Sequence, residues 1–316
     1  MSQEFKLTTL RDRAQMFQAV RIFFLERQVM EVDVPILGQG APIDAHIDVM
    51  TIPLQTGGER FLHTSPEYAM KRLLSLGIGD IYQMSHVFRD GELGHLHNPE
   101  FTLVEWYRKG MAYETLIEET LDFIRLFLGP LPSASISYRE AFRQFASIDY
   151  LTATPAELVS CAHQHHVRLP LEALLWDKNT LLHFLIGFVV EPHLGKETLT
   201  VLRDYPASQS ALAQTTLREE EAIAERFEIY FRGVELANGF HELTDSIEQR
   251  RRFEAENQER IRLGKKALPL DENFLQALKE GLPDCCGVAA GFDRLMLLRH
   301  GEKNLETVLP FSWKEA

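Results

Sequence analysis

The sequence has few cysteines and no long hydrophobic run. Only Cys161, Cys285 and Cys286 occur among 316 residues, and the last two are chain neighbours, which are poorly placed to bridge to each other. Free thiols favour a reducing compartment, so we expect a cytoplasmic protein. The longest apolar run, residues 181–190, is interrupted by a histidine and is too short to span a bilayer. The N-terminal stretch MSQEFKLTTLRDR has no signal-peptide core, so no membrane role is expected.

Basic residues are also scarce relative to acidic ones. The sequence has 33 Lys and Arg against 46 Asp and Glu, which gives a formal net charge of -13. Such a surface repels a polyanion on average, so we expect no large tRNA or DNA footprint. No Pro- or Ser-rich linker and no internal repeat divides the chain, and 45% of the residues are hydrophobic. These features predict a single domain over residues 1–316.

The hydrophobic pattern predicts a mainly antiparallel sheet flanked by helices, an α+β fold. Apolar residues at helical spacing predict a long helix over residues 10–27, followed by a strand that ends at Pro35. Few alternations of strand and helix argue against a parallel sheet. Further strands are expected over residues 60–63, 80–88, 100–107, 226–231, 234–238 and 285–290. Further helices are expected over residues 112–128 and 248–263, and a helical insertion over about 150–200.

A first group of candidate functional residues surrounds a predicted hairpin. Two strands joined by the polar loop 90–97 place Arg89 at the mouth of the sheet, where a guanidinium can neutralise charge on a carboxylate and a phosphate. The period of two on the second strand places Phe101, Glu105 and Tyr107 on one face, which can stack a purine and bind a cation. The same pattern also fits an ordinary amphipathic hairpin.

A second group lies around the turn Arg232-Gly233. This turn makes Glu228 and Glu235 diagonal neighbours on adjacent strands, where two like charges repel unless a cation lies between them. A hard ion such as Mg²⁺ that also bridges ATP phosphates fits these oxygen ligands. Acidic residues on a solvated edge strand are the alternative. Glu242 follows in a polar turn and can receive an ammonium group.

A third group is the small-residue strand beginning at Gly287, which runs into a helix. Small side chains allow close approach of a ligand to the backbone, and Arg294 in the first helical turn can bind a triphosphate. A packed strand–helix junction is the alternative interpretation. The run 161–166, with one cysteine and three histidines, has no second cluster that would complete a tetrahedral metal site, so a solvated helix face is favoured there. Packing is favoured over redox chemistry for Cys285 and Cys286.

Together these segments resemble the catalytic domain of class II aminoacyl-tRNA synthetases. The helix ending at Pro35 is similar to motif 1, residues 88–107 to motif 2, and residues 287–294 to motif 3. The stretches TSPE, HNPEFT and ELANGFHELTD resemble lysyl-tRNA synthetases in the same order. PASQSALAQ and PDCCGVAAGFDRLMLL, with the stretches around the three motifs, are most similar to the elongation factor P lysine ligase family, stand-alone paralogues of those synthetases. The likeness covers nearly the whole chain.

The resemblance implies ATP and Mg²⁺ as cofactors and assigns site residues. Arg89 and Arg294 would be the catalytic arginines, on the α- and γ-phosphates. The remaining nucleotide-binding positions would be Asp90, Gly91, Asn98, Phe101, Glu235, Leu236 and Gly291. Glu228 and Glu235 would hold Mg²⁺. The amino-acid substrate would be bound by Ser65, Pro66, Glu67, Tyr107, Asn238, Glu242 and Ala289. Among these, Glu67 would take the amino group near the reacting end, Asn238 the carboxylate, and Tyr107 with Glu242 the distal ammonium.

Three positions depart from the usual synthetase pattern. The motif 2 sequence Phe-Arg-x-Glu has Gly91 at its fourth position, with Glu92 one place later. Ser65 and Ala289 stand where synthetases commonly have alanine and glycine. A single methyl or hydroxyl group can shift substrate preference by about 1–3 kcal/mol, so these changes suit a pocket for a β-amino acid.

The activity implied by the resemblance is adenylation of (R)-β-lysine, or lysine, and its transfer to a lysine of elongation factor P. Family likeness also implies a homodimer formed through the motif 1 helix. A synthetase of the lysyl type carries an N-terminal anticodon-binding OB domain of over a hundred residues, and here the motif 1 helix begins near Leu10, so no such domain is expected. Two alternatives remain open from the sequence, a truncated tRNA-charging enzyme and a non-catalytic amino-acid-binding protein.

Overall fold

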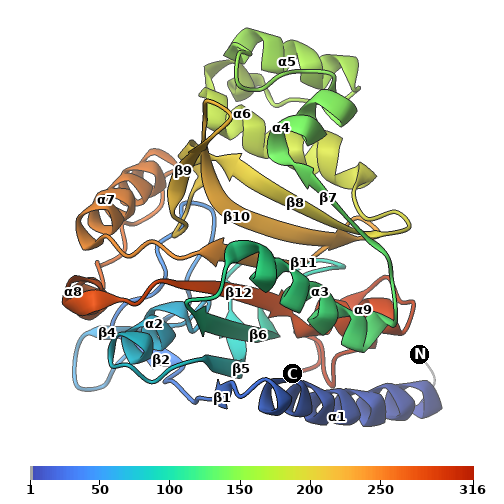
Figure 1. The fold of residues 1–316 in the computed structure, drawn as a ribbon, viewed down its shortest axis with the longest axis vertical. Coiled ribbons are helices and arrows are strands. Elements are labelled where there is room, and N and C mark those ends of the chain that lie inside the picture. Colours follow the sequence, from blue (N-terminus) through green and yellow to red (C-terminus); the bar gives the residue numbers. More distant parts are fainter. Residues whose placement is uncertain (1–2) are drawn as a thin grey trace. The chain divides into compact units, whose positions relative to one another are not determined.

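The computed structural model describes residues 3–316, which form two compact units. The first unit consists of Met1–Gly129 and Glu242–Ala316, and the second of Pro130–His241. The expected single domain over residues 1–316 remains a prediction. The structure confirms the predicted α+β class, because within each unit most paired strands are antiparallel and helices flank them (Figure 1).

The first unit is built on a sheet in the order β1-β5-β6-β12. Its strands are β1 (Met30–Glu31), β5 (Ile81–Phe88), β6 (Glu100–Lys109) and β12 (Cys285–Gly291), and only the β1–β5 pairing is parallel. A small separate sheet contains β2 (Leu37–Gly38), β4 (Glu59–Leu62) and β3 (Thr51–Pro53). The helices are α1 (Gln3–Glu26), α2 (Glu67–Ser75), α3 (Tyr113–Leu128), α7 (Ser246–Arg262), α8 (Glu272–Gly281), α9 (Phe292–Arg299) and the short η6 (Leu305–Thr307).

Aromatic side chains pack the core of the first unit. Phe24 of α1 stacks on Tyr82 of β5 with ring centroids 4.1 Å apart, and it meets Trp106 of β6 edge-on at 5.3 Å. Phe123 of α3 lies against the same indole at 5.0 Å. Each such buried aromatic contributes about 1.5–3 kcal/mol relative to an exposed one. This packing fixes α1 and α3 against β6, the strand that carries the candidate site.

The second unit has its own sheet and core. Its strands run in the order β11 (Val234–His241), β10 (Glu221–Phe231), β8 (Leu199–Pro206) and β7 (Ser133–Ser137), with β9 (Thr215–Arg218) also paired to β10. Its helical segments are α4 (Tyr138–Ala141), η1 (Phe142–Ala146), α5 (Pro155–Gln164), η2 (Leu171–Leu175), α6 (Lys178–Leu185), η3 (Ile186–Val190), η4 (Glu191–His193) and η5 (Ala207–Gln209). Most of these fall in the segment where a helical insertion is expected.

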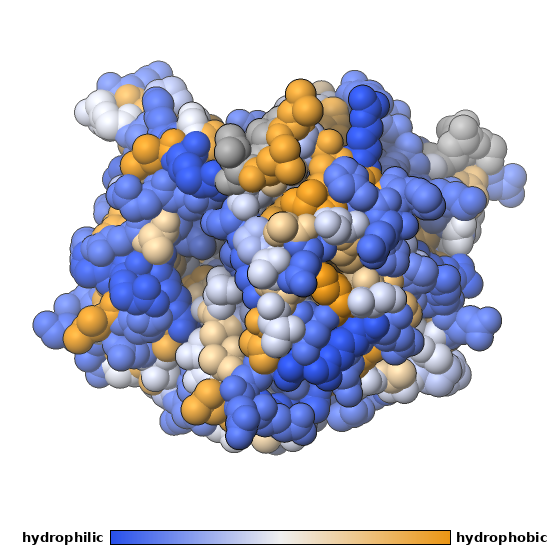
Figure 2. All heavy atoms as spheres, turned by 90° about the horizontal axis from the view of Figure 1, so that it is seen from above, coloured by the Kyte–Doolittle hydropathy of each residue, from blue (hydrophilic) through white to orange (hydrophobic). Residues whose placement is uncertain are grey.

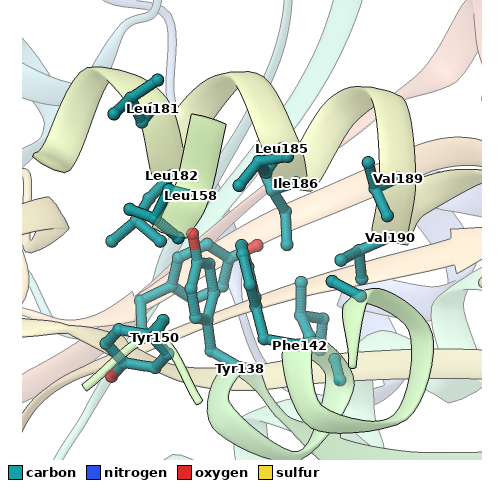
Figure 3. Close-up of a cluster of buried hydrophobic side chains, with 14 of the residues drawn as sticks. Tyr138, Phe142, Tyr150, Leu158, Leu181, Leu182, Leu185, Ile186, Val189 and Val190 are labelled. Carbon is teal, nitrogen blue, oxygen red and sulfur yellow. The ribbon is translucent and has the colours of Figure 1, made fainter. Parts of the chain in front are cut away.

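Hydrophobic side chains of α4, η1, α5 and α6 form the core of the second unit. Figure 3 shows the rings of Tyr138, Phe142 and Tyr150 facing the helix that carries Leu182 and Leu185, all of them buried. The Tyr138 and Phe142 rings stack with centroids 4.8 Å apart. Ser137 caps the first turn of α4 through a capping box with Glu140, which satisfies the backbone donors at that helix end. All residues of this hydrophobic core belong to the second unit.

The polarity of the surface, the character of the helices and the state of the cysteines can be compared with what the sequence predicts. Hydrophilic residues cover most of the face drawn in Figure 2, with hydrophobic residues interspersed among them. Among the helices of residues 3–316, none combines the length and the apolar character needed to cross a membrane. The three cysteines are buried, and none of them forms a disulfide. Cys161 lies in the core of the second unit, where its thiol donates to the Ala146 carbonyl 3.4 Å away. The sequence predicted a solvated helix face here, and at Cys161 that prediction is wrong, because the side chain is packed in the core.

Candidate active site

The mouth of the β5–β6 hairpin brings Arg89 and Phe101 together. Arg89 directly follows β5, and its backbone N–H donates to the Pro99 carbonyl at 2.9 Å, which closes the hairpin at this end. The guanidinium carbon lies 5.1 Å from the centroid of the Phe101 ring, within cation–π range. Arg89 Nη1 is 3.8 Å from Glu92 Oε1. A flat ring and a guanidinium side by side can accept a purine and a phosphate.

The loop between the strands explains the glycine at position 91. Gly91 has a φ of +75°, the left-handed region that favours glycine, and a Cβ there would meet nothing within 4 Å. Asp90 N–H donates to the Asp48 carbonyl at 2.9 Å. Glu92, one place after the usual glutamate position of motif 2, forms the ion pair with Arg89 described above. The loop therefore keeps a carboxylate beside Arg89 even though Gly91 itself has no side chain.

Arg294 faces the same loop from the start of α9. Its Nη2 lies 2.9 Å from His97 Nε2, and its Nε donates to the Leu96 carbonyl at 3.4 Å. Burial and the charge of Arg294 lower the pKa of His97, so at neutral pH the imidazole is uncharged and can accept this hydrogen bond. The arrangement places two guanidinium groups, those of Arg89 and Arg294, around one loop, as binding of a polyphosphate requires.

Asp293 fixes the direction of the first turn of α9. Its Oδ2 accepts from the Thr102 backbone N–H at 2.7 Å, and its Oδ1 accepts from Arg13 Nη1 at 2.5 Å. Arg13 comes from α1 and also donates to the Thr102 hydroxyl. Three elements are thus tied together immediately beside Arg294. Asn98, the other residue expected near adenine, donates to the Glu100 carbonyl at 2.6 Å and accepts from Trp313 N–H at 3.0 Å.

A second cluster in the same unit consists of the buried carboxylates Glu67, Glu105 and Glu242 around the ammonium of Lys71, and we call it the carboxylate cluster. Lys71 Nζ lies 2.6 Å from Glu67 Oε1 and 2.5 Å from Glu242 Oε2. Glu105 accepts hydrogen bonds at 2.6 Å from the hydroxyls of Ser65 and Tyr107. Ser65 Oγ also accepts from Glu67 N–H at 3.0 Å, so the serine that replaces alanine holds Glu105 against the start of α2.

Burial changes the acid–base behaviour of the cluster. Burial, reinforced by the charge of Glu67, raises the pKa of Glu105 to about 7. Burial also raises the pKa of Glu242 to about 8, although Lys71 opposes this shift. Both carboxyls therefore carry protons for part of the time near neutral pH. A bound ammonium group would displace those protons, which is the behaviour expected of a cation-binding site without its ligand.

Gly287 of β12 forms the floor beneath this cluster. A Cβ at this position would lie 2.3 Å from Glu242 Oε1 and 2.3 Å from Tyr107 Cε1. The sheet register pairs Gly287 with Tyr107 and Ala289 with Glu105. Only a glycine leaves room for the carboxylate and the ring at once. Gly291, in contrast, would place a Cβ 3.6 Å from Arg294 Cδ, an ordinary contact, so no steric need for glycine exists there.

We therefore expect Gly287→Ala to damage the amino-acid site specifically. The added methyl group must displace Glu242 or the Tyr107 ring, and overpacking of this kind costs about 1–3 kcal/mol, or about 5- to 150-fold in binding. Steady-state kinetics should show that increase in KM for the amino acid, with KM for ATP unchanged. Gly187→Ala, where a Cβ meets nothing within 4 Å, is the control. An unchanged KM in Gly287→Ala would refute this description of the floor.

The remaining predicted residues lie on the β10–β11 hairpin of the second unit. Arg232 and Gly233 both have positive φ, +52° and +72°, as the expected tight turn requires. Glu228 pairs with Asn238, and Glu235 pairs with Tyr230, so the two glutamates are diagonal neighbours as predicted. A register shift between Ile229 and Tyr230 marks an irregularity in this pairing. Leu236 on the same strand is buried.

Glu228 has a cationic neighbour that the sequence did not indicate. Arg226 Nη2 lies 2.6 Å from Glu228 Oε1, and the Tyr230 hydroxyl donates to the other oxygen. Burial alone would raise the pKa of Glu228, but the Arg226 charge, together with hydrogen bonds from Tyr205, Tyr230 and Arg226, lowers it. Glu228 is thus held as a carboxylate, the form that Mg²⁺ binds. In residues 3–316 no group of three or more His, Cys, Asp or Glu side chains is arranged to hold a metal, so a metal here would depend on ligands from ATP as well.

Sequence reasoning missed Lys71, His97 and Arg226. The signal for Lys71 was its spacing of four residues from Glu67, which places both side chains on one face of α2. Its other partner, Glu242, is distant in the chain, and no local pattern links the two. His97 lies in the stretch HNPEFT, but only the folded loop shows that it contacts Arg294.

Comparison with known proteins shows the family to which this chain belongs. The family of class II tRNA synthetases (D, K and N) matches residues 1–315, and the chain belongs to that family. A protein of Pasteurella multocida (strain Pm70) named elongation factor P–(R)-β-lysine ligase is 42% identical over 309 residues, which cover 96% of this chain and 94% of that protein. Proteins with the same name are 42% identical in Avibacterium paragallinarum, over 98% of this chain and 97% of that protein, and in Salmonella paratyphi B, over 97% and 95%. Membership of the family confirms the class II fold and implies that the protein uses ATP.

Proposed function

We propose that this protein is an ATP-dependent ligase that joins (R)-β-lysine, or lysine, to the ε-amino group of a lysine on elongation factor P. Family membership and three relatives with that name, each matched over nearly its full length, support the proposal. The observation that carries the choice of amino acid is the carboxylate cluster. Three buried carboxylates with one internal ammonium form a site for a substrate with two ammonium groups.

The first step joins the amino acid to ATP. The substrate carboxylate attacks the α-phosphorus and pyrophosphate leaves, so that an aminoacyl-adenylate forms. Arg89 would neutralise charge at the α-phosphate, while Phe101 stacks on the purine and Arg294 binds the γ-phosphate. Mg²⁺ held by Glu228 and Glu235 would supply positive charge to the phosphates. No side chain of this protein acts as a nucleophile in this step or in the transfer step that follows it.

The second step transfers the amino acid to the acceptor. The neutral ε-amine of the acceptor lysine attacks the adenylate carbonyl, an amide bond forms, AMP leaves and the amine loses one proton. Glu67, Glu105 with Tyr107, and Glu242 would hold the substrate ammonium groups, and Asn238 its carboxylate. The residues of this chain therefore act by positioning and by charge neutralisation.

We expect substrate binding to release protons. The pKa values of Glu105 and Glu242, about 7 and about 8, are raised in the free protein, and a neighbouring ammonium lowers them. Protons present in the free site at pH 7 must then leave, and affinity for the diamino acid should increase as the pH rises from about 6 to about 8. Calorimetry in buffers with different ionisation enthalpies measures this release directly. Heats that are independent of the buffer would contradict the cation-binding role of the cluster.

Transfer assays separate this function from its rivals. Radiolabelled (R)-β-lysine or lysine, ATP and the protein are incubated with elongation factor P or with tRNA. We expect label on elongation factor P and none on tRNA, since the net charge of -13 opposes a polyanion. Label on tRNA would instead indicate a tRNA-charging enzyme, and binding of both substrates without AMP release would indicate a non-catalytic binding protein.

We also propose a cytoplasmic homodimer. None of Cys161, Cys285 and Cys286 forms a disulfide, which suits a reducing compartment. Along α1 and just after it, Leu7, Ile22, Leu25 and Met30 are 47%, 54%, 75% and 52% exposed, a row of apolar side chains that a second copy can cover. Sedimentation at micromolar concentration should give the mass of a dimer, and a monomer there would refute this part of the proposal.

A further inference from the structure

Lys71 lies at the centre of the carboxylate cluster without a role in the steps above. It is 1% exposed and comes one helical turn after Glu67 on α2. Its ammonium lies between Glu67 and Glu242, at 2.6 and 2.5 Å. The Tyr107 and Phe274 ring centroids are 6.0 and 5.9 Å away. A buried lysine with these neighbours is held in one place, unlike a lysine at a surface.

The charge of the cluster depends on this lysine. With all three carboxylates ionised, the single positive charge of Lys71 leaves the four groups with two negative charges in excess, and excess buried charge is costly. In the free protein, protons on Glu105 and Glu242 can neutralise these two negative charges. In the complex, the two ammonium groups of a diamino acid can neutralise them. Without Lys71 the same three carboxylates would leave three negative charges, one more than the two ammonium groups of the substrate neutralise.

Lys71 also has a geometric effect on its two partners. Two carboxylates only a few ångströms apart cannot both ionise without a cation between them, and instead share a proton and bond to each other. The ammonium of Lys71 prevents this, because each carboxylate gives it one oxygen. The other oxygen of Glu242, Oε1, lies over Gly287 beside Tyr107.

Lys71 is not suited to react with the adenylate itself. Burial alone would lower the pKa of Lys71, but the charges of Glu242 and Glu67 outweigh burial and raise it. The amine is therefore protonated at neutral pH and is not a nucleophile. The titratable groups that face it come from several elements of the first unit, namely Glu67, Glu105, Tyr107, Glu242 and Cys285.

We propose that Lys71 is a positioning residue of the amino-acid site, which holds Glu67 and Glu242 as separate carboxylates and matches the charge of the cluster to a substrate with two ammonium groups. This inference deepens the proposed function and rests on it. In this proposal Lys71 does not act on the reacting atoms directly. Its effect on the reaction passes through the two glutamates.

The test replaces Lys71 by Met or Gln in the full chain. Lys71→Met keeps the apolar stem and removes the charge, so Glu67 and Glu242 should share a proton and close on each other. We expect KM for (R)-β-lysine in ATP–pyrophosphate exchange to rise about 100-fold at pH 7, with KM for ATP within about twofold. Lys71→Gln can still donate to one carboxylate, so its KM should rise about 10-fold, and it provides the test if Lys71→Met does not fold.

The pH profile distinguishes positioning from a structural role. The shared proton is lost as the pH rises, so the increase in KM should shrink between pH 7 and about 9. A structural role alone would lower the melting temperature and affect KM for ATP and for the amino acid equally at every pH. Arg72→Gln removes a positive charge from the next residue of α2, which is exposed, and should leave both KM values unchanged.

Two different failures can be told apart. If the unmodified protein catalyses no exchange with (R)-β-lysine or lysine, the proposed function is wrong and this inference is overturned with it. If the unmodified protein is active, and folded Lys71→Met or Lys71→Gln keeps the same KM and pH profile, the inference about Lys71 is wrong and the proposed function stands.

Discussion

Replacement of Arg294 by alanine should abolish ATP–pyrophosphate exchange, with a loss of about 1000-fold or more in rate. Arg294 is one of two guanidinium groups at the hairpin loop, and its charge would bind the triphosphate as charge develops on it. Its hydrogen bonds to His97 and to the Leu96 carbonyl lie at the protein surface or partly buried. Their loss should change the free energy of unfolding by only about 0.5 kcal/mol.

Arg299 on the same helix provides a matched control. Its guanidinium pairs with Asp12 of α1, with Nε 2.6 Å from Oδ2, and donates to the Phe127 carbonyl at 2.8 Å. We therefore expect Arg299→Gln to lower the melting temperature while exchange is retained, the opposite of Arg294→Ala. Exchange at the normal rate in folded Arg294→Ala would remove Arg294 from the active site.

Replacement of Glu105 by glutamine should lower activity and raise stability. Glu105 is a buried carboxylate that would pair with a substrate ammonium, and removal of one partner of a buried ion pair costs about 3–5 kcal/mol, or about 150- to 5000-fold in kcat/KM. Glutamine is nearly isosteric and can keep hydrogen bonds to Ser65 and Tyr107. The fold should therefore survive the change.

The gain in stability should depend on pH in a defined direction. The pKa of Glu105 is about 7 in the folded protein and about 4.3 in an unfolded chain. The folded state thus holds the proton more tightly, and wild-type stability falls as the pH rises from about 4 to about 7. Above that range Glu105→Gln should be more stable than wild type by about 1–3 kcal/mol, and below it the two should be equal. Chemical denaturation at pH 4.5 and pH 8 measures both values.

Glu119 is the control for Glu105. It is a buried glutamate on α3 that accepts from Trp106 Nε1 at 3.0 Å and pairs with Arg108 at 3.4 Å, outside the carboxylate cluster. Glu119→Gln should keep exchange activity and lose stability, because ion pairs are broken. If Glu105→Gln retained wild-type kcat/KM, Glu105 would have no part in substrate binding.

Periodic patterns predicted the strands that carry the candidate site. The expected strands over residues 80–88, 100–107 and 285–290 correspond to β5, β6 and β12, within a few residues at each end. Alternation of side chains also placed Glu105 and Tyr107 on one face, and their hydrogen bond confirms this. These features are local, so the sequence contains enough information to predict them.

Other elements depend on packing that the sequence does not display. The polar, largely exposed strand β7 has the sequence SASIS and pairs in parallel with β8, so neither burial nor a hairpin turn marked it. Helix α1 (Gln3–Glu26) includes residues that precede the periodic apolar residues. The helix is tied to the rest of the unit by Arg13, whose partner Asp293 comes from the other end of the chain. The Lys71–Glu242 ion pair is likewise a contact between distant segments.

The central claim is that a buried set of carboxylates and a pair of arginines activate a diamino acid for attachment to elongation factor P. Mass spectrometry of elongation factor P, after incubation with this protein, ATP and each lysine isomer, tests it most directly. The account predicts a gain of one lysyl or β-lysyl residue on a single lysine, dependent on ATP and lost with Arg294→Ala. An unmodified elongation factor P, under conditions in which the protein is folded and binds ATP, would contradict it.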